Sequence, residues 1–303
     1  MKLRHLAAGL LVGALALTAC GREGSPGAES SGPTQTAAAG VTVEGSPTFA
    51  AMQQRGRVVM GVRSDQPGLG FQDATTGQYS GFDIEIARLV AAQLGFSPDQ
   101  LEYKVVPSAA REDTIERGEI DYMVGTYTIN DNRKQRVSFA GPYYVAGQSL
   151  LVRSGETAIT SKDTLKGKKV CSVTGSTPIQ RVRDQKLTED SNIVEFKTYS
   201  ECVSQLLDKK VDAVTTDDSI LKGYAAQNQS QLKFVGKPFI DPKTGKPYPE
   251  KYGIGLAHDD KALRDFVNAA LESAFSDGTW QKIYDGTLGK SGSAGSPPAL
   301  EKY

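Results

Sequence analysis

The sequence predicts an α/β fold of two lobes joined by a hinge of two chain crossings. Strand-like and helix-like segments alternate along the chain, this pattern occurs twice, and a further strand and two helices follow the second set, which we expect to return to the first lobe. Such alternation favours largely parallel strand pairing. A chain of 303 residues, 39% of them hydrophobic, is long enough to bury the core of one or two domains. We place lobe 1 at residues 49–145 plus 241–290 and lobe 2 at residues 146–240.

The first residues have the form of an export signal. Lys2 and Arg4 precede an apolar run from Leu6 to Leu17, which is too short to span a membrane. Small residues follow, and Cys20 stands where a bacterial lipobox is cleaved. We therefore expect residues 1–19 to be a lipoprotein signal peptide, with lipid on Cys20 holding the protein at the outer face of the cell membrane. The alternative is a plain secretory signal with an incidental cysteine.

Low-complexity segments flank the expected fold. Residues 20–48 are rich in Gly, Ser, Pro, Ala and Thr without an apolar period, so we expect a flexible tether there and a disordered tail at residues 291–303. Lys plus Arg number 35, as do Asp plus Glu, and removal of the leader leaves 33 basic against 35 acidic residues. This balance argues against nucleic acid as a partner.

The first set of elements is expected between residues 57 and 128. Its clearest member is a helix at residues 83–94, which has an apolar face, an acidic residue, Asp83, in its first turn, and Gly95 at its end. The other predicted elements are strands at Arg57–Val62, Leu101–Val106 and Ile120–Thr128 and a helix at Ala109–Arg117.

The second set repeats this pattern, and an extended connector at Phe139–Val152 precedes it. The predicted strands are Lys169–Val173, Ile193–Tyr199 and Val211–Thr216, and the helices are about Pro178–Lys186, Glu201–Lys209 and Ser219–Gln227. A Pro- and Gly-rich turn at residues 241–249 then leads to a strand at Tyr252–Ala257 and helices at about Lys261–Phe275 and Asp277–Tyr284. If this last part rejoins lobe 1, two connectors cross between the lobes and form a hinge.

Two cysteines remain besides Cys20. Cys171 and Cys202 lie on the exported side, where disulfides persist, and adjacent elements carry them. We expect them to form a disulfide, which stabilises the fold by about 3 kcal/mol in the chain-entropy model. The alternative is two buried free thiols.

The sequence offers little for catalysis. His258 is the one histidine beyond the leader, and its place before Asp259 and Asp260 is typical of a solvated helix start. This excludes histidine metal clusters, and it excludes Ser-His-Asp and Cys-His sites unless His258 serves. No P-loop, GxGxxG or CxxC occurs either. We therefore expect no enzyme and no cofactor.

Polar residues follow several predicted strands, at the edge where open α/β sheets bind ligands. Arg133 lies in the first turn of a helix that Asn130 or Asp131 would cap, where the helix dipole disfavours a cation. It therefore requires an anion nearby. A ligand carboxylate would supply one through a bidentate contact, and a surface pair with Asp131 is the equal alternative.

Two more turns offer groups for a zwitterion. Thr177 before Pro178 is typical of a helix N-cap, and Gly175 lets the backbone approach an anion, although ordinary capping would also explain the threonine. Asp217 and Asp218 end a strand and begin a helix, so one is expected to cap the helix and the other is available to a cation. Arg133, the turn at 175–177 and Asp217 together match the carboxylate and ammonium of an α-amino acid.

Two segments resemble a known family. Gly81-Phe82-Asp83-Ile84-Glu85-Ile86-Ala87 and, more specifically, Thr126-Tyr127-Thr128-Ile129-Asn130-Asp131-Asn132-Arg133 followed by Val137–Tyr144 look like motifs of solute-binding family 3, the amino-acid-binding proteins of bacterial ABC importers. The resemblance covers about Arg57 to Leu288. It implies a periplasmic-binding-protein-like fold (type II) and a monomer that closes on an L-amino acid and delivers it to an ABC permease.

The resemblance also assigns roles at matching positions. Arg133 would hold the ligand α-carboxylate, Thr126 and Thr128 would add hydroxyl or backbone contacts, Thr177 would offer its N–H, and Asp217 would bind the α-ammonium. Gly125 and Ser176, beside these residues, complete the expected polar lining.

One departure from the family pattern bears on specificity. Gly68 stands roughly where the family places an aromatic residue against the ligand side chain, and the loss of the ring together with the gain of Arg63 favours a polar or anionic side chain. This stretch is similar to the glutamate-binding lipoproteins of Gram-positive bacteria, so glutamate is the expected ligand, with aspartate, glutamine and asparagine as alternatives. Arg63, with Asp65 beside it, and Arg181 are candidates for side-chain contacts, and a solvated position is the alternative for both arginines.

Other functions on the same fold are the main alternatives. Some relatives are dehydratases or cell-wall lytic enzymes with a carboxylic acid in the cleft, and such an acid needs a raised pKa, for which Asp65 and Glu85 are the weak candidates. A sensory ligand-binding domain is a third interpretation, but we see no transmembrane helix or signalling domain after the fold.

Overall fold

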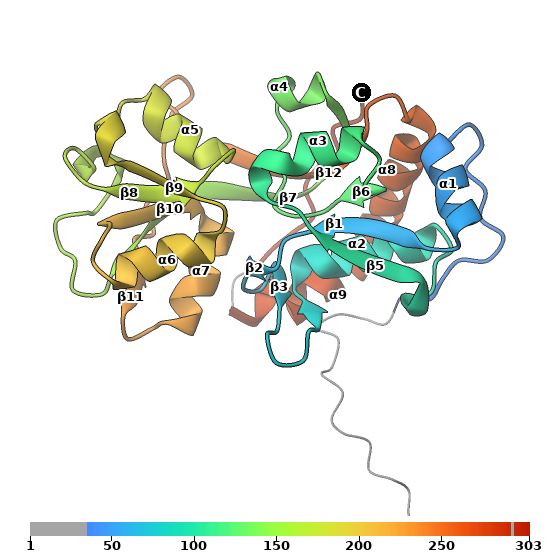
Figure 1. Cartoon of the computed structure of the whole chain (residues 1–303), viewed down its shortest axis with the longest axis horizontal. Coiled ribbons are helices and arrows are strands. Elements are labelled where there is room, and N and C mark those ends of the chain that lie inside the picture. Colours follow the sequence, from blue (N-terminus) through green and yellow to red (C-terminus); the bar gives the residue numbers. More distant parts are fainter. Residues whose placement is uncertain (1–34, 292–293) are drawn as a thin grey trace, which may run out of the picture.

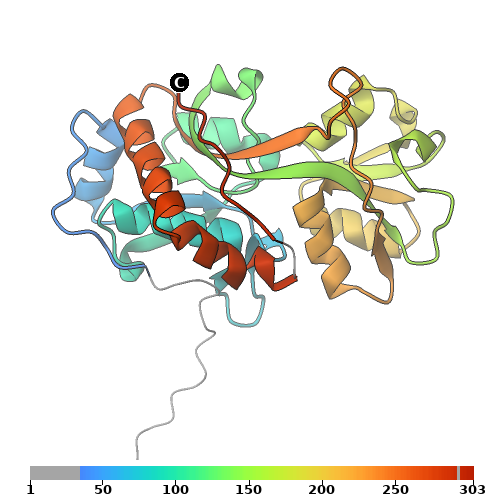
Figure 2. The same cartoon turned by 180° about the vertical axis from the view of Figure 1, so that it is seen from behind.

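The two-lobed α/β fold is confirmed in the computed structural model, which describes residues 35–291 and 294–303 (Figures 1 and 2). Nine of the described strands form one sheet in the order β5-β1-β6-β12-β7-β10-β8-β9, with β11 paired to β7, and the other three form a separate small sheet. The expected signal peptide, Cys20 and the first part of the tether lie outside the described residues. Within the described residues, no helix has both the length and the apolar character needed to cross a membrane.

Lobe 1 is built around β1 (Val58–Val62), which is buried along its whole length. It pairs in parallel with β5 (Leu101–Val105) on one side and β6 (Tyr122–Met123) on the other. Helix α2 (Phe82–Gln93) is buried over most of its length because its apolar residues lie against this sheet. The other helices that complete lobe 1 are α1 (Pro47–Arg55), α3 (Arg111–Glu116), α4 (Asp131–Lys134), α8 (Lys261–Ser276) and α9 (Thr279–Gly286).

Lobe 2 repeats the pattern with β8 (Val170–Val173) at its centre. Strand β8 pairs in parallel with β9 (Ile193–Phe196) and β10 (Ala213–Asp217). Its remaining elements are α5 (Thr177–Asp184), α6 (Tyr199–Leu207), α7 (Asp218–Gln227) and β11 (Leu232–Phe234). The predicted disulfide is confirmed: Cys171 in β8 bonds to Cys202 in α6, and both residues are buried.

The hinge consists of two strands. β7 (Val137–Arg153) is 17 residues long and crosses from lobe 1 to lobe 2 without a break, although glycine and proline punctuate its sequence. It pairs antiparallel with β12 (Pro249–Ala257) as far as Gly147 and then with β10 from Gln148 onward. Figure 1 shows this pair as the bridge between the lobes. The expected hinge of two crossing strands is therefore present.

The tether prediction is wrong for residues 35–48, which pack on lobe 1. The Ala38 N–H donates to the Ala92 carbonyl at 2.8 Å, and Val41 and Val43 lie against the core. Ser46 then caps α1, a helix that the sequence analysis missed. The two valines give this segment apolar surface to bury, which its low-complexity composition concealed.

The tail prediction is also wrong for residues 294–303. The Glu301 N–H donates to the Gly141 carbonyl, the Phe139 N–H donates to the Tyr303 hydroxyl, both at 2.8 Å, and Leu300 packs against the core. Figure 2 shows this segment running along the face of lobe 1 that carries α8. The anchoring side chains lie in the last residues, beyond the Gly-, Ser- and Pro-rich stretch from which the tail was predicted.

The strand predicted at Ile120–Thr128 is shorter in the structure: it ends at Met123, and Thr126, three residues later, has a φ of 45°, outside the extended region. Asp83 holds this turn: one carboxylate oxygen accepts the Thr126 N–H at 2.9 Å and the other accepts the Tyr143 hydroxyl at 2.8 Å. Burial raises the pKa of Asp83 to about 6. The first turn of α2 therefore positions a loop next to the hinge strand.

Candidate functional site

A pocket lies between the lobes, beyond the carboxyl ends of β6, β8 and β10. This is where the topology of parallel sheets places ligands. It is lined from lobe 1 by Ser108, Arg111, Thr126, Thr128 and Arg133, and from lobe 2 by Ser176, Thr177, Pro178, Tyr199 and Asp217. Six of the ten residues predicted from the sequence therefore lie together in one lining: Thr126, Thr128, Arg133, Ser176, Thr177 and Asp217.

Arg133 is positioned by α4. The Asn130 side chain caps this helix by accepting the Arg133 N–H at 2.9 Å, which places Arg133 in the first turn, as predicted. The guanidinium donates to the Thr128 carbonyl at 2.6 Å and to the Gly175 carbonyl, in lobe 2, at 3.0 Å. Arg133 is buried whereas Asp131 is exposed, so the alternative of a surface pair between them is wrong.

Arg111 is a second buried arginine in the lining, and the sequence analysis missed it. Its Nε donates to the Ser108 carbonyl at 3.1 Å, and its Nη1 donates to the carbonyls of Gly125 and Thr126 at 3.3 and 3.4 Å. Burial and then the charge of Arg133 lower the pKa of Arg111 to about 10, so Arg111 remains charged at neutral pH. Arg133 was predicted because a cation in the first turn of a helix requires an anion nearby. Arg111 also lies in the first turn of a helix, so the same criterion would have identified it.

Thr177 does not cap its helix. Ser176 is the N-cap of α5, and its side chain accepts the Ile179 N–H at 3.4 Å. The prediction failed because proline is tolerated throughout the first turn, so Pro178 does not fix the first helical position. The Thr177 hydroxyl instead donates to Oε2 of Glu250 at 2.6 Å.

Gly175 brings lobe 2 into backbone contact with lobe 1. Its φ is +79°, and a Cβ atom at this position would lie 2.8 Å from the Cα of Ala109. A side chain there would strain the backbone and push the lobes apart.

Asp217 lines the pocket from lobe 2. It occupies the N-cap position of α7, yet its side chain makes no capping hydrogen bond. One oxygen accepts the Tyr252 hydroxyl at 2.7 Å, and Oδ1 is buried without a hydrogen-bond partner among the described residues. Burial and then the negative charge of Glu250 raise the pKa of Asp217 well above its ordinary value. A buried carboxylate oxygen without a partner suits an ammonium group.

Glu250 is a buried carboxylate between the lobes that the sequence analysis missed. Besides Thr177, its Oε2 accepts the hydroxyl of Thr128 from lobe 1 at 2.8 Å. Its Oε1 lies 2.7 Å from Nη2 of Arg181, whose guanidinium also stacks over the Tyr248 ring at 4.2 Å. Arg181 is therefore paired within the protein and is absent from the pocket lining, and the solvated alternative for it is also wrong.

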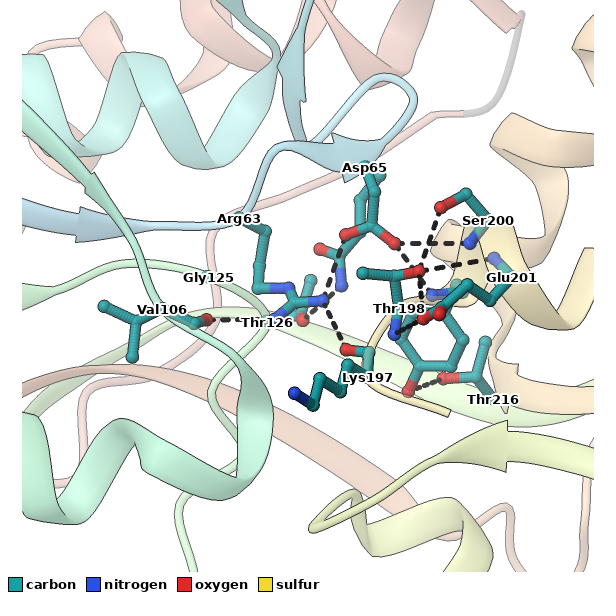
Figure 3. Close-up of polar contacts among 12 residues, drawn as sticks. Arg63, Asp65, Val106, Gly125, Thr126, Lys197, Thr198, Ser200, Glu201 and Thr216 are labelled. Atoms are coloured by element: carbon teal, nitrogen blue, oxygen red, sulfur yellow. Dashed lines mark hydrogen bonds and ion pairs between the residues drawn. The ribbon is translucent and has the colours of Figure 1, made fainter. Parts of the chain in front are cut away.

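Arg63 and Asp65 lie outside the pocket lining. Figure 3 shows their side chains facing each other. Arg63 is 1% exposed, so the solvated alternative is wrong. Its guanidinium donates to the Val106 carbonyl at 2.9 Å and pairs with Asp65 at 3.0 Å. Glu85, the other acid considered for an enzyme, pairs with Arg88 at 2.7 Å within α2 and does not line the pocket.

Comparison with known proteins agrees with this architecture. Residues 58–290 match the bacterial extracellular solute-binding proteins, family 3. The glutamate-binding protein GluB of Corynebacterium glutamicum is 39% identical over 271 residues, covering 84% of this chain and 88% of that protein. The glutamine-binding protein GlnH of Bacillus subtilis is 34% identical over 283 residues, covering 93% and 96%.

A solved structure extends the likeness to three dimensions. An ancestral arginine-binding protein bound to glutamine is 34% identical with a TM-score of 0.69, covering 78% of this chain and 99% of that chain. The family match spans most of the chain. The fold, the hinge and the interlobe pocket agree with it. The chain therefore belongs to the bacterial extracellular solute-binding proteins of family 3.

Proposed function

We propose that this protein is the substrate-binding component of an ABC-type amino-acid importer and that it binds glutamate between its lobes. It delivers the amino acid to a permease from an extracytoplasmic position, anchored to the outer face of the cell membrane by lipid on Cys20. The pocket carries groups for a zwitterion on both lobes, and a ligand that contacts both lobes favours the closed form.

The charge of the lining is the observation that favours an acidic ligand. Arg111 and Arg133 contribute two positive charges and an ionised Asp217 one negative charge, which gives the lining a net charge of +1. An amino acid with an ionised acidic side chain carries a net charge of −1 and neutralises this lining. Glutamine or asparagine leaves the net charge of the lining at +1 and arginine raises it to +2, although Arg133 also pairs with Glu112 at 3.3 Å. An unbalanced charge is costly in a buried site.

Different residues of the pocket bind the different charged groups of the ligand. Arg133 binds the α-carboxylate, with hydroxyl or backbone contacts from Thr126, Thr128 and the turn at Ser176 and Thr177. Asp217 binds the α-ammonium through its Oδ1. We assign the distal carboxylate to Arg111, because Arg111 lines the pocket, whereas Arg63 and Arg181 lie outside the lining and are paired with Asp65 and Glu250.

Titration calorimetry of the mature protein with single amino acids tests this function. Glutamate should bind most tightly, with weaker binding of aspartate, glutamine or asparagine. The recovered amino acid should be chemically unchanged, which separates a binding protein from an enzyme on the same fold. If none of these four amino acids binds, the proposed substrate class is wrong.

Arg111→Gln should remove the preference for glutamate over glutamine. Loss of a charge-assisted contact of about 2 kcal/mol should weaken glutamate binding roughly 30-fold and leave glutamine binding nearly unchanged. Calorimetric titration of wild type and variant with both amino acids gives this ratio. Arg136→Gln, at an exposed arginine paired with Asp113 and Glu116, is the matched control and should change neither affinity. Equal losses for both ligands in Arg111→Gln would contradict a role in side-chain selection.

Ligand affinity should fall as the pH falls, because Asp217 must be ionised to hold the ammonium. Burial and then the charge of Glu250 raise its pKa in the free protein well above 3.8. A bound ammonium lowers this pKa, so affinity rises as the pH rises through the free-protein pKa, and binding there releases a proton. Calorimetry in two buffers of different ionisation enthalpy measures the released proton. A dissociation constant that stays independent of pH at every pH above the ordinary pKa of an aspartate would rule out this linkage.

A further inference from the structure

Asp65 reaches from lobe 1 to lobe 2 without lining the pocket. It lies in β2 (Asp65–Gln66), which forms a small sheet with β3 (Gly70–Gln72) and β4 (Tyr79–Ser80). Its Oδ2 accepts the N–H of Tyr199 at 2.7 Å and the N–H of Ser200 at 3.3 Å, which are the first two residues of α6 in lobe 2. Figure 3 shows the Asp65 carboxylate between Arg63 and the start of this helix.

The start of α6 leaves these two N–H groups for a partner outside the helix. A helix has four N–H groups at its beginning without partners in the helix. In α6 a capping box satisfies the outer two: the Glu201 carboxylate accepts the Thr198 N–H at 3.0 Å, and the Thr198 hydroxyl accepts the Glu201 N–H at 3.3 Å. Asp65 accepts the N–H groups of the two residues between them. The other lobe thus completes the cap of this helix.

Arg63 holds the Asp65 carboxylate in place for this contact. The guanidinium is 3.0 Å from Oδ1 of Asp65, and it also donates to the Lys197 carbonyl, in lobe 2, at 3.4 Å. Both side chains are largely buried. A carboxylate at a helix N-terminus lies at the favourable end of the helix dipole, and the paired arginine offsets the burial of its charge.

The loop that carries Asp65 also fits closely against α7 of lobe 2. The Tyr224 hydroxyl donates to the Asp65 backbone carbonyl. One residue earlier in α7, a Cβ atom at Gly223 would lie 2.3 Å from the Pro67 carbonyl oxygen. The two lobes are therefore in backbone contact here, and the loop lies between the start of α6 and the middle of α7.

We propose that Asp65 is a latch for lobe closure. Its carboxylate, oriented by Arg63, binds the N-terminus of α6 only when the lobes meet, so it stabilises the closed form and slows ligand release. Because Asp65 does not line the pocket, it does so equally for every amino acid that binds. The effect on ligand release rests on the proposed function, whereas the effect on closure itself does not.

Asp65→Asn is the direct test, since it removes the charge and keeps the shape. Stopped-flow measurement of amino-acid release should show a rate constant roughly 10-fold higher than in wild type, by the same factor for glutamate and glutamine. Asp265→Asn removes an exposed charge from α8 of the same lobe and should leave the rate unchanged. A release rate like that of wild type would overturn the latch, and so would a change in the ratio between the two ligands.

Ser200→Pro tests the other side of the contact. Proline is tolerated in the first turn of a helix, and it removes one of the two N–H donors without altering lobe 1. Release should become faster than in wild type but slower than in Asp65→Asn, and the melting temperature of the ligand-free protein should stay within a few degrees of wild type. An unchanged release rate in this variant would contradict the role of the α6 N-terminus.

A measurement without ligand separates the latch from the proposed function. Spin labels at Thr75 in lobe 1 and Lys210 in lobe 2, both exposed, report the distance between the lobes. Ligand-free Asp65→Asn should show a smaller closed fraction than ligand-free wild type, whichever ligand the protein binds. Identical distance distributions would overturn the latch even if glutamate binding is confirmed.

Discussion

Arg133→Ala should weaken the binding of every amino acid by roughly 100-fold or more, because removing one partner of a buried charged contact costs about 3 kcal/mol. The α-carboxylate is common to all candidate ligands, so glutamate and glutamine should lose affinity by the same factor. This distinguishes the variant from Arg111→Gln, which should affect glutamate alone. Titration calorimetry with both amino acids gives the two factors.

Two variants control this result. Arg133→Lys keeps the charge and loses the planar pair of donors, so its affinity should lie between those of wild type and Arg133→Ala. Arg136→Ala removes an exposed arginine from the same segment and should leave the dissociation constant unchanged. Arg133 also donates to Gly175 across the cleft, so the unfolding transition of each variant is recorded beside the titration. A dissociation constant for Arg133→Ala within a few-fold of wild type would exclude Arg133 as the carboxylate ligand.

Replacing Cys171 and Cys202 together with alanine should lower the free energy of unfolding by about 3 to 4 kcal/mol. The disulfide closes a loop with a sequence separation of 31, and its loss frees this loop in the unfolded chain. Urea denaturation of the mature protein at neutral pH, followed by circular dichroism, measures the change. The expected result is a lower urea concentration at the midpoint of unfolding together with a larger m value. The m value rises because the unlinked chain exposes more surface on unfolding.

Reduced wild-type protein provides the matched comparison. It should unfold at nearly the same urea concentration as the double variant, and the reductant should have no further effect on the variant. If the oxidised wild type and the double variant are equally stable, the disulfide does not constrain the unfolded state as the chain-entropy argument requires.

The sequence predicted best those elements whose signals are local. Helix α2 carries its acidic first turn, its apolar face and its terminal glycine within a few residues of one another, and its predicted span agrees with the structure to within one residue. The strand predicted at Ile120–Thr128 was too long. The turn at Thr126 depends on Asp83, which is distant in sequence, so this turn has no local sign in the sequence. Residues 35–48 and 294–303 were misjudged because a few anchoring side chains outweigh a low-complexity composition.

The same distinction applies to the site. Arg133, Thr128 and Asp217 were found because each follows a strand or begins a helix, and these positions can be read from the sequence. Glu250 lies at the start of a strand. Ligand-binding residues were sought only after the ends of strands, so the sequence carried no signal for Glu250. Its pairing with Arg181 joins residues far apart in the chain, and this pairing removes Arg181 from the ligand candidates.

The path of the chain through the hinge has a consequence for the order of folding. All of lobe 2 lies between β7 and β12, so it is continuous in sequence, whereas the sheet of lobe 1 lacks β12 until lobe 2 has been synthesised. Closing that long loop carries an entropic cost, which favours lobe 2 as the first unit to fold. Lobe 1 can complete its sheet only when the segment from Pro249 onward returns across the hinge.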